Sequence, residues 1–159
     1  MNEKQLFQQM NFIRNRTIAF LDATTEQEAD IIPDGFHNSI RWNLGHILVN
    51  HEVLLSTFNE EATPLPDHLT HLFKKGTSPL EWTSAPPTLN ELRAHLQQQV
   101  QRSEAYSPSL FTKKEQPLRI GNSIELFTLE ELFSFSNWHE GVHQGTIVGM
   151  KHTLGLPLR

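Results

Sequence analysis

Residues 128–155 read TLEELFSFSNWHEGVHQGTIVGMKHTLG, and this stretch gives the strongest indication of the fold. It opens with Thr128 and Glu131, which have the spacing of a capping box that starts a helix. Its apolar residues recur at steps of three and four, and Gly155 followed by Pro157 ends the pattern. The stretch therefore predicts one long amphipathic helix over about 128–154, with a buried face that needs partner helices.

The same helical pattern recurs through the rest of the chain. Apolar spacing predicts three further long helices, over residues 3–22, 39–58 and 88–105. A brief helix is expected over residues 67–75. Asn38 or Ser39 can cap the second of the long helices, and Thr88 with Glu91 forms a capping box for the third. Thr25 with Glu28 has the same spacing before a short turn.

Four long helices predict an all-α chain, folded as a four-helix bundle with long connections between helices 2 and 3 and between helices 3 and 4. A small hairpin near 119–124 is expected in the second connection. The buried face of the first helix is expected to include Met10, Ile13 and Thr17. Because there is no repeat or low-complexity tract, residues 1–159 are expected to form a single domain.

The composition excludes several classes of protein. With 18 acidic and 13 basic residues the net charge is −5, which argues against a broad basic surface for nucleic acid. No apolar run reaches the roughly 18 residues of a membrane helix, and residues 1–5 lack the pattern of a signal peptide. The absence of cysteine excludes disulfides and thiolate sites. We therefore expect a cytoplasmic protein without membrane or nucleic-acid partners.

Two of the nine histidines lie on one side of the predicted 128–154 helix. His139 and His143 are four residues apart, so they share a face and can chelate one ion. Leu132 and Met150 lie on the same stripe, which places both imidazoles on the face expected to be buried. A shared metal would satisfy them, since an unpaired buried polar group costs about 1–3 kcal/mol. Alternatively they are core or surface histidines, because nine histidines make a chance pair common.

The string His-Glu-Gly-Val-His at 139–143 also matches the H-E-x-x-H signature of zinc metalloproteases. No acidic residue follows Glu140 to act as a third ligand, and Thr146 and Gly149 depart from the extended form of the signature. A metalloprotease is therefore not expected. A ferritin-like di-iron site is not expected either, because it would need a second Glu-x-x-His that the chain lacks.

A third ligand must therefore come from another helix. His46 in the second helix is the best candidate, since His51 lies on the leucine-rich side of that helix and His37 precedes it. Asn43 and Asn50 flank His46 and are placed to orient ligands or substrate, or else form the polar edge of the helix.

The segment NSIRWNLGHI at 38–47, paired with the late His-x-x-x-His-x-Gly-x-Ile, resembles the DinB/YfiT-like superfamily over nearly the whole chain. The resemblance implies a four-helix bundle that holds one divalent ion, zinc or nickel, on three histidines. Carried over by position, these ligands are His46, His139 and His143. The family often has Arg and Gln around the glycine that follows, where this chain has Gln144 and Thr146; the ligands themselves are intact.

The resemblance also implies a metal-dependent enzyme, either a hydrolase or a low-molecular-weight thiol S-transferase, with a small-molecule substrate. Three neutral imidazoles leave at least one position on the ion for water or a thiol, as in catalytic metal sites. Glu140 is the nearest carboxylate in sequence and is predicted as a general base, with a surface role as the alternative. The contrasting hypothesis is a non-catalytic, metal-binding stress-response protein whose ion is structural.

Three glycines, Gly141, Gly145 and Gly149, recur at four-residue steps on the side of the last helix away from its histidines. Each glycine costs a helix about 1 kcal/mol relative to alanine, so three in register invite an explanation. We expect this glycine strip to allow a close helix contact, within the chain or in a homodimer. The alternative is a tolerant surface.

Overall fold

The computed structural model describes residues 3–58, 65–106 and 116–158, and this part of the chain is mostly helical. The long helices are α1 (Glu3–Asp22), α3 (Ile40–Phe58), α5 (Leu89–Glu104) and α7 (Leu129–Thr153). The shorter elements are α2 (Glu26–Ala29), α4 (Asp67–Phe73), the 3-10 helix η1 (Pro79–Glu81) and the antiparallel strands β1 (Leu118–Ile120) and β2 (Ile124–Leu126). For the described residues, the prediction of an all-α fold with a small hairpin is confirmed.

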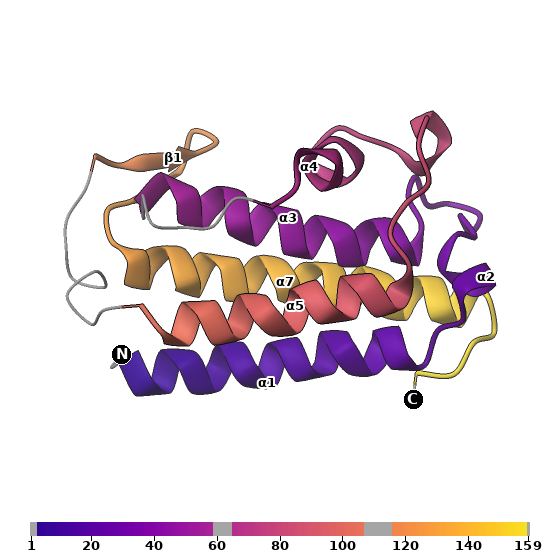
Figure 1. Cartoon of the computed structure of the whole chain (residues 1–159), viewed down its shortest axis with the longest axis horizontal. Coiled ribbons are helices and arrows are strands. Elements are labelled where there is room, and N and C mark those ends of the chain that lie inside the picture. The colour runs from indigo at the N-terminus through magenta and orange to yellow at the C-terminus, as the bar shows by residue number, and fades with distance from the viewer. Residues whose placement is uncertain (1–2, 59–64, 107–115, 159) are drawn as a thin grey trace.

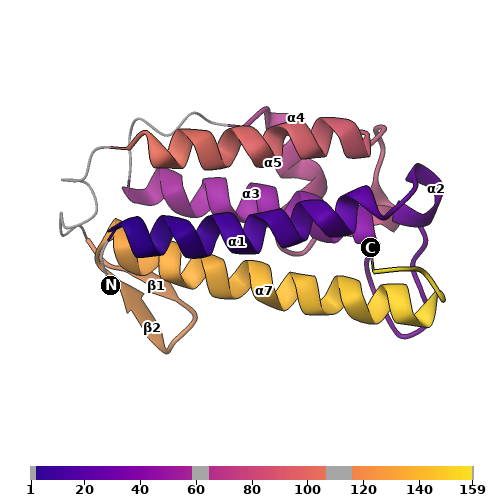
Figure 2. The ribbon, with the colours of Figure 1, turned by 90° about the horizontal axis from the view of Figure 1, so that it is seen from below.

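The long helices lie side by side (Figures 1 and 2). Helices α1 and α3 each contact both α5 and α7. Followed by colour in Figure 1, α1 and α7 run in one direction and α3 and α5 in the other. Helix α4 packs on α3 within the connection to α5, and the hairpin lies in the connection to α7. Helices α3 and α7 are therefore antiparallel neighbours.

Local hydrogen bonds fix where several helices begin. In three places a threonine hydroxyl accepts from the N–H of a glutamate three residues on, and that glutamate accepts from the threonine N–H. These capping boxes are Thr25–Glu28, Thr88–Glu91 and Thr128–Glu131, each as predicted. At the start of α3 the hydroxyl of Ser39 accepts from the N–H of Trp42 at 3.2 Å. The starts of these helices therefore follow from short-range sequence signals.

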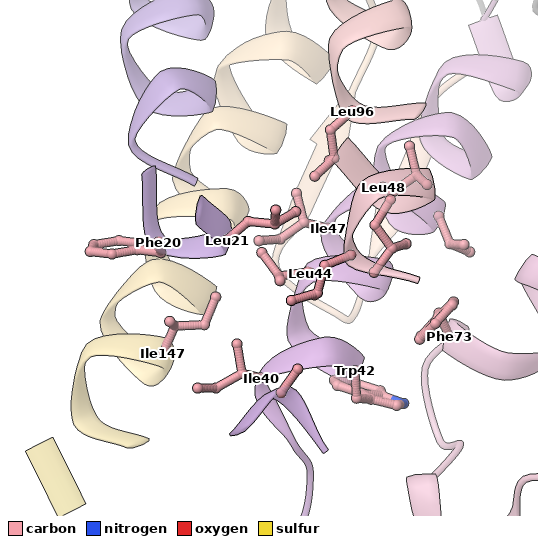
Figure 3. Packing of buried hydrophobic residues seen from close by; sticks show 14 of the residues in the cluster. Phe20, Leu21, Ile40, Trp42, Leu44, Ile47, Leu48, Phe73, Leu96 and Ile147 are labelled. Carbon is pink, nitrogen blue, oxygen red and sulfur yellow. The ribbon is translucent and has the colours of Figure 1, made fainter. Parts of the chain in front are cut away.

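The described residues form two hydrophobic core clusters, one at each end of the long helices. Figure 3 shows the cluster that joins Phe20, Leu44 and Ile147, from α1, α3 and α7. The second cluster centres on Leu6, Met10, Leu55, Leu132 and Phe133. Together they place the middle of α3 and α7 between two tightly packed apolar regions.

The buried face of α1 differs from its prediction at one position. Arg14 is only 2% exposed, whereas Ile13 is half-buried. Met10 and Thr17 are buried as predicted. A charged side chain thus occupies the interior between the two clusters, and it needs a partner there.

The glycine strip of α7 has little covering it within the described chain. A Cβ atom added at Gly141 or Gly145 would meet nothing within 4 Å, whereas one at Gly149 would lie 3.4 Å from the ring of Phe36. A close helix contact inside the chain is therefore not found at the first two glycines.

Across residues 3–58, 65–106 and 116–158, no helix is both long enough and apolar enough to cross a membrane.

Candidate metal centre

Helices α3 and α7 bring together the three histidines predicted as ligands. His46 lies on α3 and His139 and His143 lie one turn apart on α7, and the ligand nitrogens of all three fall within 4.8 Å of one another. The Nε2 atoms of His139 and His143 are 3.3 Å apart. Two nitrogens on a tetrahedral zinc ion, each about 2.0–2.1 Å from it, are separated by about 3.3 Å. The group could therefore hold a metal ion.

The ring of His46 is held from two sides. Its Nδ1 donates to the carbonyl oxygen of Phe73 at 2.6 Å, so the lone pair of the neutral ring is on Nε2. The indole of Trp42 stacks on the imidazole, with ring centroids 4.6 Å apart and planes 8° from parallel. His46 therefore presents a preoriented nitrogen to the centre.

The close approach of α4 that brings the Phe73 carbonyl to His46 depends on a glycine. A Cβ atom at Gly45 would overlap the ring of Phe73. The absence of a side chain at this position lets the end of α4 lie directly on α3.

Asparagine side chains of α3 hold the two histidines of α7. His143 donates from Nδ1 to Oδ1 of Asn43 at 2.8 Å, which leaves the lone pair on its Nε2. The Nδ2 of Asn50 lies 3.3 Å from Nδ1 of His139 and donates to it. His139 therefore carries its proton on Nε2, facing His143, and must change tautomer to offer that nitrogen to an ion. A half-turn of the Asn50 amide would present its oxygen to Nδ1 and stabilise the changed tautomer.

Burial keeps these imidazoles neutral, which is the form that binds metal. Desolvation, reinforced by the neighbouring histidines, lowers the pKa of His139 to about 4 and that of His143 to about 3. Desolvation also lowers the pKa of His46, against the opposing hydrogen bond to the Phe73 carbonyl. The positive charge of Lys75 lowers that pKa further.

The structure brings Glu140 to α1 rather than to the three histidines. Both oxygens of its carboxylate accept from the guanidinium of Arg14, at 2.9–3.2 Å, and the hydroxyl of Thr17 donates to Oε1 at 2.6 Å. The side chains of Arg14 and Glu140 are 2% and 4% exposed. Glu140 therefore belongs to a buried ion pair between α1 and α7.

That ion pair extends into α5 and α3. Arg14 also donates to the side-chain oxygen of Gln99 at 3.0 Å, and Gln99 donates to Glu52 at 2.6 Å. Neither the pairing of Arg14 with Glu140 nor the role of the Phe73 carbonyl was predicted from the sequence. A signal for the first was present, because Arg14 lies four residues after Met10 and three before Thr17, on the apolar stripe of α1.

The remaining histidines lie apart from the centre. His51 is buried and its Nδ1 lies 2.6 Å from the hydroxyl of Ser136. The half-buried or exposed ones are His37, His68, His71, His95 and His152. Among the described residues the group of potential metal ligands contains His46, His139 and His143 alone.

Fold and site together define a class: a helical protein with a three-histidine group between two antiparallel long helices. Residues 9–147 match the family model of the DinB superfamily, and the chain belongs to this superfamily. The resemblance found in the sequence is thereby confirmed. A search of curated proteins finds no match to the chain.

Proposed function

We propose that the chain is a divalent-metal-dependent enzyme whose ion is held by His46, His139 and His143. The observation that carries this proposal is the grouping of three ligand nitrogens within 4.8 Å, each on a buried or half-buried ring. Imidazole ligands suit zinc and nickel. A divalent ion so held supplies Lewis-acid chemistry and lowers the pKa of a bound water or thiol.

The proposed reaction is hydrolysis or transfer to a low-molecular-weight thiol, with a small-molecule substrate. The ligand count supports catalysis over a structural ion, because structural zinc sites use four protein ligands and the described chain supplies three. The alternative, a non-catalytic metal-binding protein, requires a fourth protein ligand.

Within this proposal the surrounding residues act through the histidines. The Phe73 carbonyl, Asn43 and Asn50 orient the three rings, as partners of metal-bound histidines do. The general-base role of Glu140 stays a prediction, and its contacts favour a different role. Because Arg14 and Thr17 occupy its oxygens, we propose that Glu140 joins α7 to α1 and so holds His139 and His143 in register.

We further propose that the four long helices form the four-helix bundle of DinB type, in a single domain over 1–159. The glycine strip (Gly141, Gly145, Gly149) is proposed to contact a second copy in a homodimer. Its first two glycines support this, because nothing in the described chain covers them.

Elemental analysis of protein purified without an affinity tag tests the proposal. The expected result is one divalent ion per chain, lost when His46, His139 or His143 is replaced by alanine. His95→Ala is the matched control and should keep the ion, because His95 lies on α5, outside the three-histidine group. Full metal occupancy in the His143→Ala protein would show that the ligands are wrongly assigned.

A further inference from the structure

The groups that hold the three imidazoles are all electrically neutral. They are the carbonyl of Phe73 and the amides of Asn43 and Asn50. Carboxylates often fill this role in metal sites, and their negative charge partly offsets that of the ion. Here the potential ligand group contains no carboxylate among the described residues, and Glu140 is already paired with Arg14. Among the described residues, the groups that hold the three rings therefore leave the charge of a divalent ion uncompensated.

The two helices that carry the histidines expose no charged side chain beside them. Over 40–58 the charged residues are Arg41 and Glu52, which are 3% and 4% exposed and paired within the protein. Over 132–150 Glu140 is the single Asp, Glu, Lys or Arg, and it is 3% exposed. The exposed neighbours one turn from Asn50 and His139 are instead Val53 and Val142, at 50% and 47%.

We propose that this centre takes a small organic monoanion with an uncharged, apolar body; the inference rests on the metal site proposed above. The anionic head offsets a charge that is costly in a partly buried place, and the body lies along Val53 and Val142. Asn43 and Asn50 are positioning residues: they orient His143 and His139 without adding negative charge, and so keep the centre attractive to an anion.

The test uses the full chain loaded with Co²⁺, whose uptake is first measured by elemental analysis and calorimetry. Acetate, hexanoate and uncharged 1-hexanol are then titrated while the visible absorption of Co²⁺ is followed. Acetate should change the spectrum, hexanoate should do so at severalfold lower concentration because more apolar surface is covered, and 1-hexanol should leave it unchanged.

Variants that add a negative charge test whether the amides of Asn43 and Asn50 favour binding of an anion or only support the structure. Asn50→Asp places a carboxylate beside His139 and should weaken acetate binding at least about threefold, while Co²⁺ affinity is kept or increased. Loss of packing alone would weaken both affinities together. Asn43→Asp gives a second variant at His143, and the exposed Asn90→Asp on α5 is the matched control for the added charge.

Each outcome decides one point. Failure of the parent protein to take up Co²⁺ would overturn the proposed function itself. Uptake of Co²⁺ with a spectrum indifferent to acetate and hexanoate would leave the metal site standing and refute the anion. Equal affinities for acetate and hexanoate would refute the apolar body. If Asn50→Asp and Asn43→Asp behave like Asn90→Asp, the amides do not select for charge.

Discussion

The guanidinium of Arg14 and the carboxylate of Glu140 lie where neither would be stable alone. Each is almost completely buried, and two parallel hydrogen bonds join them between α1 and α7. Removal of one member of such a pair leaves an uncompensated buried charge, whereas replacement of both by apolar groups does not. This pair therefore makes the register of α1 against α7 sensitive to single substitutions.

We expect Glu140→Gln to lower the free energy of unfolding by about 3–5 kcal/mol, because it leaves Arg14 buried without its counter-charge. The double variant Arg14→Met, Glu140→Leu should recover most of that loss. Urea denaturation monitored by circular dichroism measures both. A Glu140→Gln protein as stable as the parent would show that the ion pair contributes little.

Single residues also show what the sequence could and could not predict about the site. His139 and His143 were predictable because their spacing is a property of one helix, and His46 because it lies in a family motif. The Phe73 carbonyl was not predictable, since a backbone group bonded 27 residues away leaves no mark in side-chain patterns. Glu140 was expected to face solvent or substrate because its partner on α1 is distant in sequence.

At the scale of elements, Gly45 and Gly141 give a matched pair of tests. An alanine at 45 would collide with the Phe73 ring, so Gly45→Ala should cost about 1–3 kcal/mol of stability and weaken metal binding by shifting the carbonyl that orients His46. Within one chain Gly141→Ala enters open space on a helix, so in the separated monomer it should be neutral or stabilising by up to about 1 kcal/mol. Denaturation and calorimetric metal titration distinguish them; a tolerated Gly45→Ala would mean that α4 can move away freely.

The starts of the helices were predictable because they depend on residues close together in the sequence. The contacts of the glycines were not predictable, because they depend on residues far apart in the sequence. Thr88–Glu91 and Thr128–Glu131 are short-range signals, and α5 and α7 begin at the residue after each threonine. The docking of α4 on Gly45 and the burial of Arg14 in place of Ile13 depend on neighbours that only the folded chain supplies.

For the whole molecule, the lowered histidine pKa values predict that the metal-free protein loses stability in acid. The folded chain protonates His139 near pH 4 and His143 near pH 3, whereas the unfolded chain does so near pH 6.5. Between those values the unfolded state binds more protons, so the free energy of unfolding should fall as pH drops from about 7 to about 4. Urea titrations across this range measure the slope, which should be shallower in His143→Gln. A slope that His143→Gln leaves unchanged would contradict the prediction.

The proposed homodimer is tested by Gly145→Leu. A branched side chain on the glycine strip should separate the subunits, because the change enters a two-fold interface twice and overpacking costs about 1–3 kcal/mol each time. Light scattering should show the variant as a monomer at concentrations where the parent is a dimer, with metal content unchanged. A monomeric parent would refute the dimer.

The stacking of Trp42 on His46 has an optical consequence. An indole stacked on the ring of His46, a proposed ligand, lies close enough to the three histidines for its fluorescence to respond to an ion bound there. Ions with unfilled d shells, such as nickel or cobalt, quench a neighbouring indole, whereas zinc with its filled shell does not. The chain has two further tryptophans: Trp138 is 61% exposed and emits at longer wavelength than the buried Trp42, and the half-buried Trp82 can be removed by Trp82→Phe so that the blue edge belongs to Trp42. If the proposed site holds an ion, the blue edge of the emission spectrum would thus report in solution which kind of ion it is.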